Sequence, residues 1–240
     1  MSSTRKKYFI RLYIRIIIFI ACLCMCFKPE IFNILNGMNF FKKFHILHIL
    51  WIIWIFDMIF QIIPLKNKVA LGSQKLFANR FKEIKDKVNY KALKKYIKFT
   101  TAKAYKVMII WILLIASIGM LYYFNIINKV WLFMITVFFY VCDLICVLIW
   151  CPFRLIMKNK CCTTCRIFNW DHLMMFSPLI FCGGFYCLSL VVMAILAWLV
   201  WELCVLIYPK RFSEMTNEAL RCTNCTDKLC TQYCQKLRKE

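Results

Sequence analysis

The chain has 240 residues, 62% of them hydrophobic, and a formal net charge of +22 at pH 7. A soluble domain is nearer 45–50% apolar, so this composition excludes an ordinary soluble globular protein and indicates several membrane spans. The basic residues flank the apolar runs, where they set topology and contact anionic lipid. No recognised basic nucleic-acid-binding motif is present, so nucleic-acid binding is not expected.

Apolar runs long enough for membrane-spanning helices, about 20 residues each, cover much of the chain. They lie at residues 8–27, 44–65, 107–127 and 130–150, followed by a longer tract at 173–208. Pro178 and the Gly183-Gly184 pair interrupt this tract, so we predict a short fifth helix and a longer sixth. A single kinked helix is the alternative. The predicted fold is all-α, a polytopic helical membrane protein with about six transmembrane helices.

The positions of lysine and arginine predict the orientation, because basic loops stay on the cytoplasmic side. Both termini are then cytoplasmic, in the cell (inner) membrane. The predicted divisions are two N-terminal spans (1–65), a basic amphipathic segment (66–106), spans three and four (107–150), a cysteine-rich loop (151–170), the hairpin of spans five and six (171–208) and a cysteine-rich tail (209–240).

The basic segment 66–106 is too polar to insert, but its apolar residues recur at three- and four-residue steps, as on an amphipathic helix. A helix lying on the inner leaflet would direct its lysines to anionic lipid and its aromatic rings into the bilayer. A solvated connector helix is equally compatible with this periodicity.

The first apolar run has two further features. Arg11 and Arg15 are expected to reach back to the membrane interface with their long side chains. Residues 18–22 resemble a lipoprotein cleavage site in which Cys22 would be lipidated, although an uncleaved anchor is the default for such a run.

The sixteen cysteines divide into two groups by location. Eight lie in or near apolar spans, where a free thiol packs as a small hydrophobic group. They are Cys22, Cys24, Cys26, Cys142, Cys146, Cys182, Cys187 and Cys204. The other eight lie on the predicted cytoplasmic side, where thiols are kept reduced, so metal ligation is a better explanation than disulfides.

The spacing of these eight cysteines predicts a metal site of four thiolates. Two residues separate Cys162 from Cys165, and two separate Cys222 from Cys225, so each pair can turn toward one ion. A membrane hairpin between them would return the chain to the same face. A second tier, Cys151, Cys161, Cys230 and Cys234, would complete another site. Zinc and iron–sulfur clusters both accept four thiolates, so the cofactor is either.

Three acidic residues, Asp57, Asp143 and Glu202, lie inside predicted spans, where ionised groups are costly and are functional candidates. They sit at a similar depth, roughly 9–12 Å from the inner ends at 1.5 Å per residue, and could line a cation or proton path. Each could instead be protonated, or paired with a nearby Lys or Arg. Cys142 and Cys146 share a helix face beside Asp143 and could form a thiol–carboxylate metal site with it.

The three histidines are weaker candidates. His45 and His48 share a helix face at the outer start of the second span, where packing is the expected role and metal or proton binding the alternative. Asp171 is expected to cap the fifth helix, and His172 is a possible ligand beside Cys165. No nucleotide-binding loop, Ser/His/Asp order or zinc-protease motif is present, so an enzyme is not expected.

These patterns favour a membrane protein with a cytoplasmic cysteine-ligated metal centre, acting as a redox or metal-site component. Its partners are the lipid bilayer and anionic lipid at 66–106. One alternative is a cation or metal transporter that uses the intramembrane acids. The other is a non-catalytic anchor or assembly factor whose tail recruits a cytoplasmic protein partner.

Overall fold

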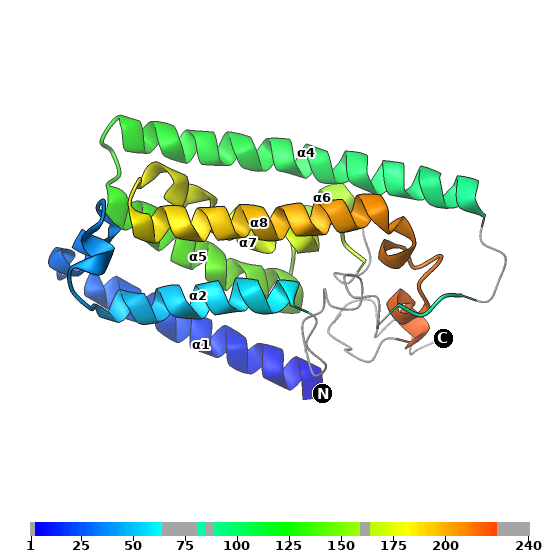
Figure 1. Cartoon of the computed structure of the whole chain (residues 1–240), viewed down its shortest axis with the longest axis horizontal. Coiled ribbons are helices and arrows are strands. Elements are labelled where there is room, and N and C mark those ends of the chain that lie inside the picture. The colour runs from blue at the N-terminus through cyan, green and yellow to red at the C-terminus, as the bar shows by residue number, and fades with distance from the viewer. Residues whose placement is uncertain (1–2, 64–80, 85–88, 159–163, 225–240) are drawn as a thin grey trace.

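In the computed structural model the described elements are helical, which confirms the all-α part of the predicted fold class (Figure 1). The structure describes residues 3–63, 81–84, 89–158 and 164–224. The long helices are α1 Ser3–Met25, α2 Ile46–Ile62, α4 Tyr90–Tyr123, α5 Lys129–Leu148 and α8 Phe185–Ile207. The short ones are η1 Pro29–Leu35, η2 Asn39–Phe41, α6 Phe153–Met157, η4 Ile167–Trp170, α7 Asp171–Phe176, η5 Ser177–Phe181, η6 Pro209–Phe212, η7 Glu218–Leu220 and η8 Cys222–Asn224.

Side-chain caps fix where the long helices begin. Asn89 accepts a hydrogen bond from the Ala92 backbone N–H, and Asn128 accepts one from that of Trp131, both at 3.1 Å. Each satisfies a first-turn donor that has no partner within its own helix. At α2 the histidines have this role. His48 Nδ1 accepts from the His45 backbone N–H at 2.9 Å, so capping accounts for both residues.

Four helices of the described chain are long and apolar enough to cross a membrane: Arg5–Met25 within α1, and α4, α5 and α8 in full. The other two predicted spans differ. The helix α2 has 17 residues, about 25 Å at 1.5 Å per residue, and the predicted fifth span is divided between α7 and η5. The structure therefore supports membrane-crossing length for four helices.

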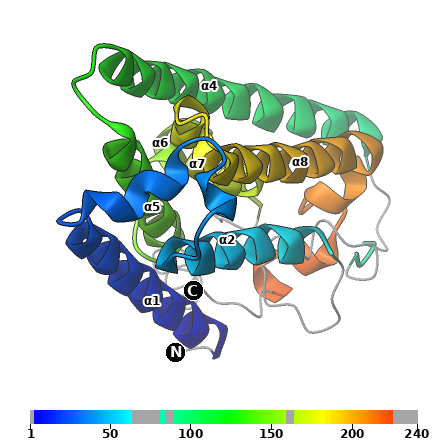
Figure 2. The same cartoon turned by 60° about the vertical axis from the view of Figure 1, so that its left-hand side comes forward.

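The chain reverses direction at Gly183 and Gly184, between η5 and α8. Gly183 has a φ of +71°, which other residues rarely adopt, and a Cβ at Gly184 would collide with the backbone carbonyl of Leu35. Beyond this turn α8 packs against α7 and η4. Residues 167–207 thus form a hairpin rather than one kinked helix (Figure 2).

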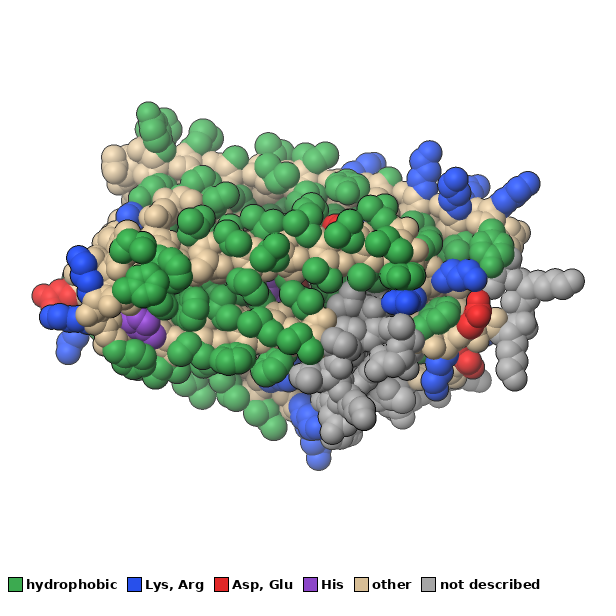
Figure 3. Space-filling view, in the orientation of Figure 1, with side chains coloured by type: hydrophobic (Ala, Val, Ile, Leu, Met, Phe, Trp, Pro, Cys, Tyr) green, Lys and Arg blue, Asp and Glu red, His purple; other side chains and the backbone are tan. Residues whose placement is uncertain are grey.

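The two ends of the bundle carry different segments (Figure 1). One end, the α4-start end, holds the starts of α1 and α4, the connection after α5, and residues 209–224. The opposite end holds residues 26–45, 124–128 and the glycine turn. Hydrophobic side chains cover the middle of the visible face, and lysines and arginines gather toward both ends (Figure 3). An apolar belt between charged ends is typical of helices that cross a bilayer.

The helix α4 runs across the predicted boundary at residue 106. It continues without a break from Tyr90 to Tyr123, so residues 90–106 and the predicted third span belong to one helix. Its 34 residues span about 51 Å, well beyond the roughly 30 Å of a hydrocarbon core. Upstream, the Lys82 carbonyl accepts the Glu218 backbone N–H at 2.8 Å, which joins residues 81–84 to the start of the tail. Residues 66–80 and 85–88 of the basic segment lie outside the described chain.

An aromatic core at the meeting of α2, α5, α7 and α8 positions the polar residues discussed below. The Trp54 ring packs against Phe133, Tyr140 and Phe176, with ring centroids 5.9, 5.7 and 5.2 Å apart. Trp54 is 1% exposed. Because Trp54 and Tyr140 lie three residues before Asp57 and Asp143, this packing brings both carboxylates to the same end of the core.

Candidate functional site

Five ionisable side chains from α1, α2, α5 and α7 form a buried network, called the ionic network below. Arg15 Nη1 donates to Asp143 Oδ2 at 2.7 Å, and Arg15 Nη2 lies 3.8 Å from Asp57 Oδ2. His172 Nε2 lies 3.4 Å from the same Asp57 oxygen without making a hydrogen bond. His172 Nδ1 is 3.1 Å from Asp171 Oδ1. Asp57 therefore joins an Arg15–Asp143 pair to an Asp171–His172 pair.

Further contacts hold the arginine end and the histidine end of this network. The Arg15 guanidinium donates to the Tyr140 carbonyl oxygen at 2.7 Å and lies 3.9 Å from the centroid of its ring. Gln61 Nε2 donates to Asp171 Oδ2 at 3.3 Å. Asp57 is the most open member, with 37% of its side chain exposed, against 16% for Asp143. It is the carboxylate that a small ion reaches most easily.

The charges of the ionic network do not balance without a further positive charge. It contains three carboxylates and one buried arginine, and Arg11, on the exposed side of α1, adds a second positive charge near Asp57. Two cations against three anions leave one negative charge in surroundings where an unpaired charge is costly. A proton on His172, a proton on a carboxyl group, or a bound cation supplies the balance. The network can therefore hold a proton or a cation.

Glu202, the third predicted intramembrane acid, is not in this network. Its Oε2 accepts from Arg166 Nη2 and its Oε1 from Trp170 Nε1, both at 2.6 Å. Glu202 and Arg166 are 9% and 8% exposed. The structure thus brings Asp57 and Asp143 to one arginine and places Glu202 in a closed pair, as in the alternative of pairing with a nearby basic residue.

Sequence reasoning missed three members of the ionic network: Arg15, Asp171 and His172. Arg15 was expected at the membrane interface but turns inward and is 8% exposed. There its guanidinium donates hydrogen bonds to the Asp143 carboxylate and the Tyr140 carbonyl oxygen on α5. Asp171 accepts the backbone N–H of His172 at 2.8 Å and binds the imidazole ring as well. The available signal was an arginine in the middle of an apolar run, which needs a buried acid when it is not at the surface.

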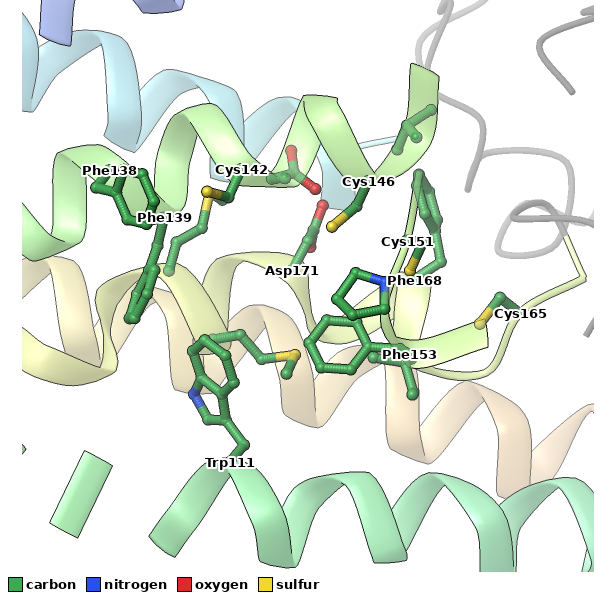
Figure 4. A pocket seen from close by; sticks show the side chains of 16 residues that line it. Trp111, Phe138, Phe139, Cys142, Cys146, Cys151, Phe153, Cys165, Phe168 and Asp171 are labelled. Carbon is green, nitrogen blue, oxygen red and sulfur yellow. The ribbon is translucent and has the colours of Figure 1, made fainter. Parts of the chain in front are cut away.

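A cavity of about 210 Å³ lies beside the ionic network, and Asp143 and Asp171 belong to its lining (Figure 4). Its walls are otherwise mostly aromatic and sulfur-containing. The aromatic residues are Trp111, Phe138, Phe139, Phe153 and Phe168, and the cysteines are Cys142, Cys146, Cys151 and Cys165. Phe138 is 50% exposed, so the cavity reaches the outer surface of α5.

Two of these thiols, Cys146 and Cys151, are hydrogen-bonded to each other. The bond donated by Cys146 lowers the pKa of the Cys151 thiol to about 7, with help from the backbone N–H groups of Phe153 and Arg154 and the Arg154 charge. Burial acts in the opposite direction but is outweighed. Cys151 is therefore about half ionised near neutral pH and is the more nucleophilic of the two.

The predicted metal ligands fall only partly within the described chain. Cys151 and Cys165 line the cavity, and for Cys222 only the backbone, in η8, is described. Outside the described residues lie Cys161, Cys162, Cys225, Cys230 and Cys234. Among the described residues, no three His, Cys, Asp or Glu side chains are grouped so as to hold a metal ion. The four-thiolate site, and zinc or iron–sulfur as its cofactor, stay predictions.

The cysteine-rich loop and the start of the tail nevertheless meet. Cys165 and Thr164 line a small cavity of about 20 Å³ together with Phe212 of η6. The described parts of both cysteine-bearing segments therefore lie at the same end of the bundle, as a shared site requires.

Comparison with protein-family models, with curated proteins and with solved structures finds no match to this chain. Its function is therefore inferred from the geometry of the ionic network and of the thiol-lined cavity.

Proposed function

We propose that the protein is an integral membrane protein that exchanges a proton or a small cation at the ionic network, and that this exchange accompanies transport across the membrane. The observation that carries the proposal is the enclosure of three carboxylates with one buried arginine and one histidine in an apolar helical bundle. Ionisable groups in such surroundings mark ion and proton pathways.

Asp57 is the proposed point of exchange. Its Oδ2 is shared between Arg15 at 3.8 Å and His172 at 3.4 Å, whereas Asp143 has Arg15 at 2.7 Å and Asp171 has His172 at 3.1 Å. A proton or cation that binds Asp57 therefore leaves the two closer pairs intact. Asp57 is also the most exposed of the three carboxylates.

In the proposed membrane arrangement the bundle crosses the bilayer six times. The helix α2 and residues 167–181 complete the passes of the four longer helices. The α4-start end faces the cytoplasm of the cell (inner) membrane, because basic loops remain on that side. The first turns of α4, which carry Lys91, Lys94 and Lys98, then lie at the cytoplasmic surface near anionic lipid.

Proton flux into proteoliposomes tests this function. Purified protein is reconstituted with an internal pH-sensitive dye, and flux is driven by a potassium diffusion potential, with and without sodium or divalent cations outside. We expect flux above that of protein-free vesicles, and its loss in Asp57→Asn and Asp143→Asn. Glu202→Gln is the matched control, since it neutralises a buried acid outside the ionic network and should keep the flux.

Two results would overturn the proposal. One is wild-type flux equal to that of protein-free vesicles under every cation condition. The other is equal flux in wild type and Asp57→Asn, each verified as monodisperse in detergent before reconstitution.

A cysteine-ligated metal centre is the second candidate, favoured by the meeting of Cys165 with the start of the tail. Metal content and a visible spectrum of anaerobically purified protein test it, beside a variant with Cys162, Cys165, Cys222 and Cys225 changed to Ser. Iron, sulfide and a bleachable band near roughly 400 nm indicate an iron–sulfur cluster, whereas stoichiometric zinc without colour indicates a structural site. Metal that is absent, or unchanged in the variant, removes this candidate.

A further inference from the structure

We propose that Cys146 and Cys151 form a redox-active dithiol that reduces a lipid-soluble quinone bound in the 210 Å³ cavity. This inference does not depend on ion exchange at the ionic network. It rests on three features of the cavity: a hydrogen-bonded pair of thiols, a wall of aromatic rings, and an opening on the outer surface of α5.

The thiol pair has the arrangement that two-electron thiol chemistry needs. Cys146 lies in the last turn of α5, and Cys151 follows in the connection after it. Their sulfur atoms are within hydrogen-bonding distance, so a small movement of the connection brings them together. Cys151, in the connection outside the helix, is the proposed attacking group, and Cys146, held in the last turn of α5, closes the disulfide.

The rest of the cavity selects the oxidant. At about 210 Å³ it is smaller than the roughly 300–1,000 Å³ of pockets for drug-sized molecules, so it suits a single substituted ring. Trp111, Phe139 and Phe153 provide flat apolar walls for such a ring (Figure 4). The exposed Phe138 places the opening where an apolar tail extends into lipid. A quinone combines a small ring, an apolar tail and the capacity for two electrons.

The reaction balances without another reagent. The Cys151 thiolate adds to a ring carbon of the quinone, and the Cys146 sulfur then attacks Cys151 Sγ and displaces the ring. One S–S bond forms, the temporary C–S bond to the ring breaks, and the quinone receives two electrons. Its two protons are the one from the Cys146 thiol and one from solvent, which replaces the proton that Cys151 lost on ionising, so the product is a quinol. Asp143 and Asp171 line the cavity and are placed to pass protons to the ring oxygens.

Anaerobic mixing of the reduced protein in nanodiscs with a decyl-substituted benzoquinone tests the proposal. Quinol formation is followed by absorbance, and the disulfide is located by mass spectrometry after alkylation of free thiols. We expect one quinol for each protein, with one disulfide joining Cys146 to Cys151. Cys151→Ser should lose both products. Cys24→Ser should retain both, because Cys24 is an exposed thiol of α1 and does not line the cavity.

A second variant separates the quinone site from the thiols. Met174→Trp places a large ring in the cavity, so it should lose quinol formation but still form the Cys146–Cys151 disulfide with diamide, which needs no ring site. Absence of quinol in the wild type, a disulfide between other cysteines, or full activity in Met174→Trp would each overturn the proposal. Asp57→Asn should leave the quinone reaction intact, which keeps this test separate from that of ion exchange.

Discussion

The two buried acidic regions of this bundle differ in how fully their charges are matched. Glu202 has one cation and one indole donor, each 2.6 Å from its own carboxylate oxygen. Asp57 has a single oxygen shared between two more distant partners, at 3.8 and 3.4 Å. A carboxylate whose charge is fully matched gains no stabilisation from another proton or ion, whereas a carboxylate with only distant partners is stabilised by one. The comparison therefore favours a structural role for Glu202 and agrees with the exchange role proposed for Asp57.

Removing the shared arginine should have the largest effect. Arg15→Met leaves Asp143 and Asp57 without their cation, and breaking a buried pair in this way typically costs about 3–5 kcal/mol of unfolding free energy. Unfolding in detergent micelles measures the loss. Arg11→Met, on the exposed side of the same helix, is the control and should change stability far less. Equal losses in both variants would contradict the inward role of Arg15.

Breaking the Arg166–Glu202 pair should lower the free energy of unfolding but leave proton flux unchanged. Glu202→Gln keeps an acceptor for Trp170 but leaves the Arg166 charge buried and uncompensated, which is expected to cost about 3 kcal/mol. Proton flux measured in vesicles below the unfolding temperature should remain. A variant that keeps its stability and loses flux would reverse the roles assigned to the two regions.

Asp57→Asn should show the opposite pattern. Because Asp57 is partly exposed and its contacts are long, its removal should change unfolding free energy by less than about 1 kcal/mol. Flux should nevertheless be lost, since an amide takes up neither the proton nor the cation. Unfolding and flux measured on one preparation test both parts. A stability loss as large as that of Arg15→Met would show that Asp57 serves mainly to hold the fold.

The smallest expected effect concerns the pH dependence of Cys151 reactivity. With its pKa at about 7, the thiol is half ionised near pH 7, so its alkylation rate should rise through neutral pH and level off above pH 8. Cys146→Ala removes the donated hydrogen bond and should move this midpoint to higher pH. Peptide-resolved alkylation measures it. An unchanged midpoint in Cys146→Ala would show that Cys146 does not lower the pKa of Cys151.

The sequence was informative where a local pattern suffices. Long apolar runs predicted the helical class, and Gly183-Gly184 marked an interruption that the structure shows as a reversal. The sequence was not sufficient where the direction of a side chain, or its partner, depends on residues far away in the chain. The inward turn of Arg15 is set by Asp143, 128 positions away. The apolar residues at three- and four-residue steps in 66–106 predicted an amphipathic segment, and the structure adds that one helix continues from Tyr90 into the apolar run.

The candidate site was predicted in part for the same reason. Asp57 and Asp143 were identified because a charged residue inside an apolar run can be recognised from the sequence alone. Asp171 and His172 lie at the edge of such a run, where a helix cap was sufficient explanation. Only the tertiary structure reveals that His172 lies against Asp57 of α2. The Cys146–Cys151 pair was divided between two groups of cysteines because the predicted end of the span fell between them.

The unbroken helix α4 connects its lysine-rich end directly to the thiol-lined cavity. Its basic end projects beyond the bundle (Figure 1). Lys103 contacts the carbonyl oxygen of Met157 in α6 at 3.5 Å. Two turns further along, Trp111 forms a wall of the thiol-lined cavity. A helix that tilts as one body would pass a displacement of its lysine-rich end to that wall of the cavity. Attachment of this end to a charged membrane surface would thereby tune access to the thiols from a distance.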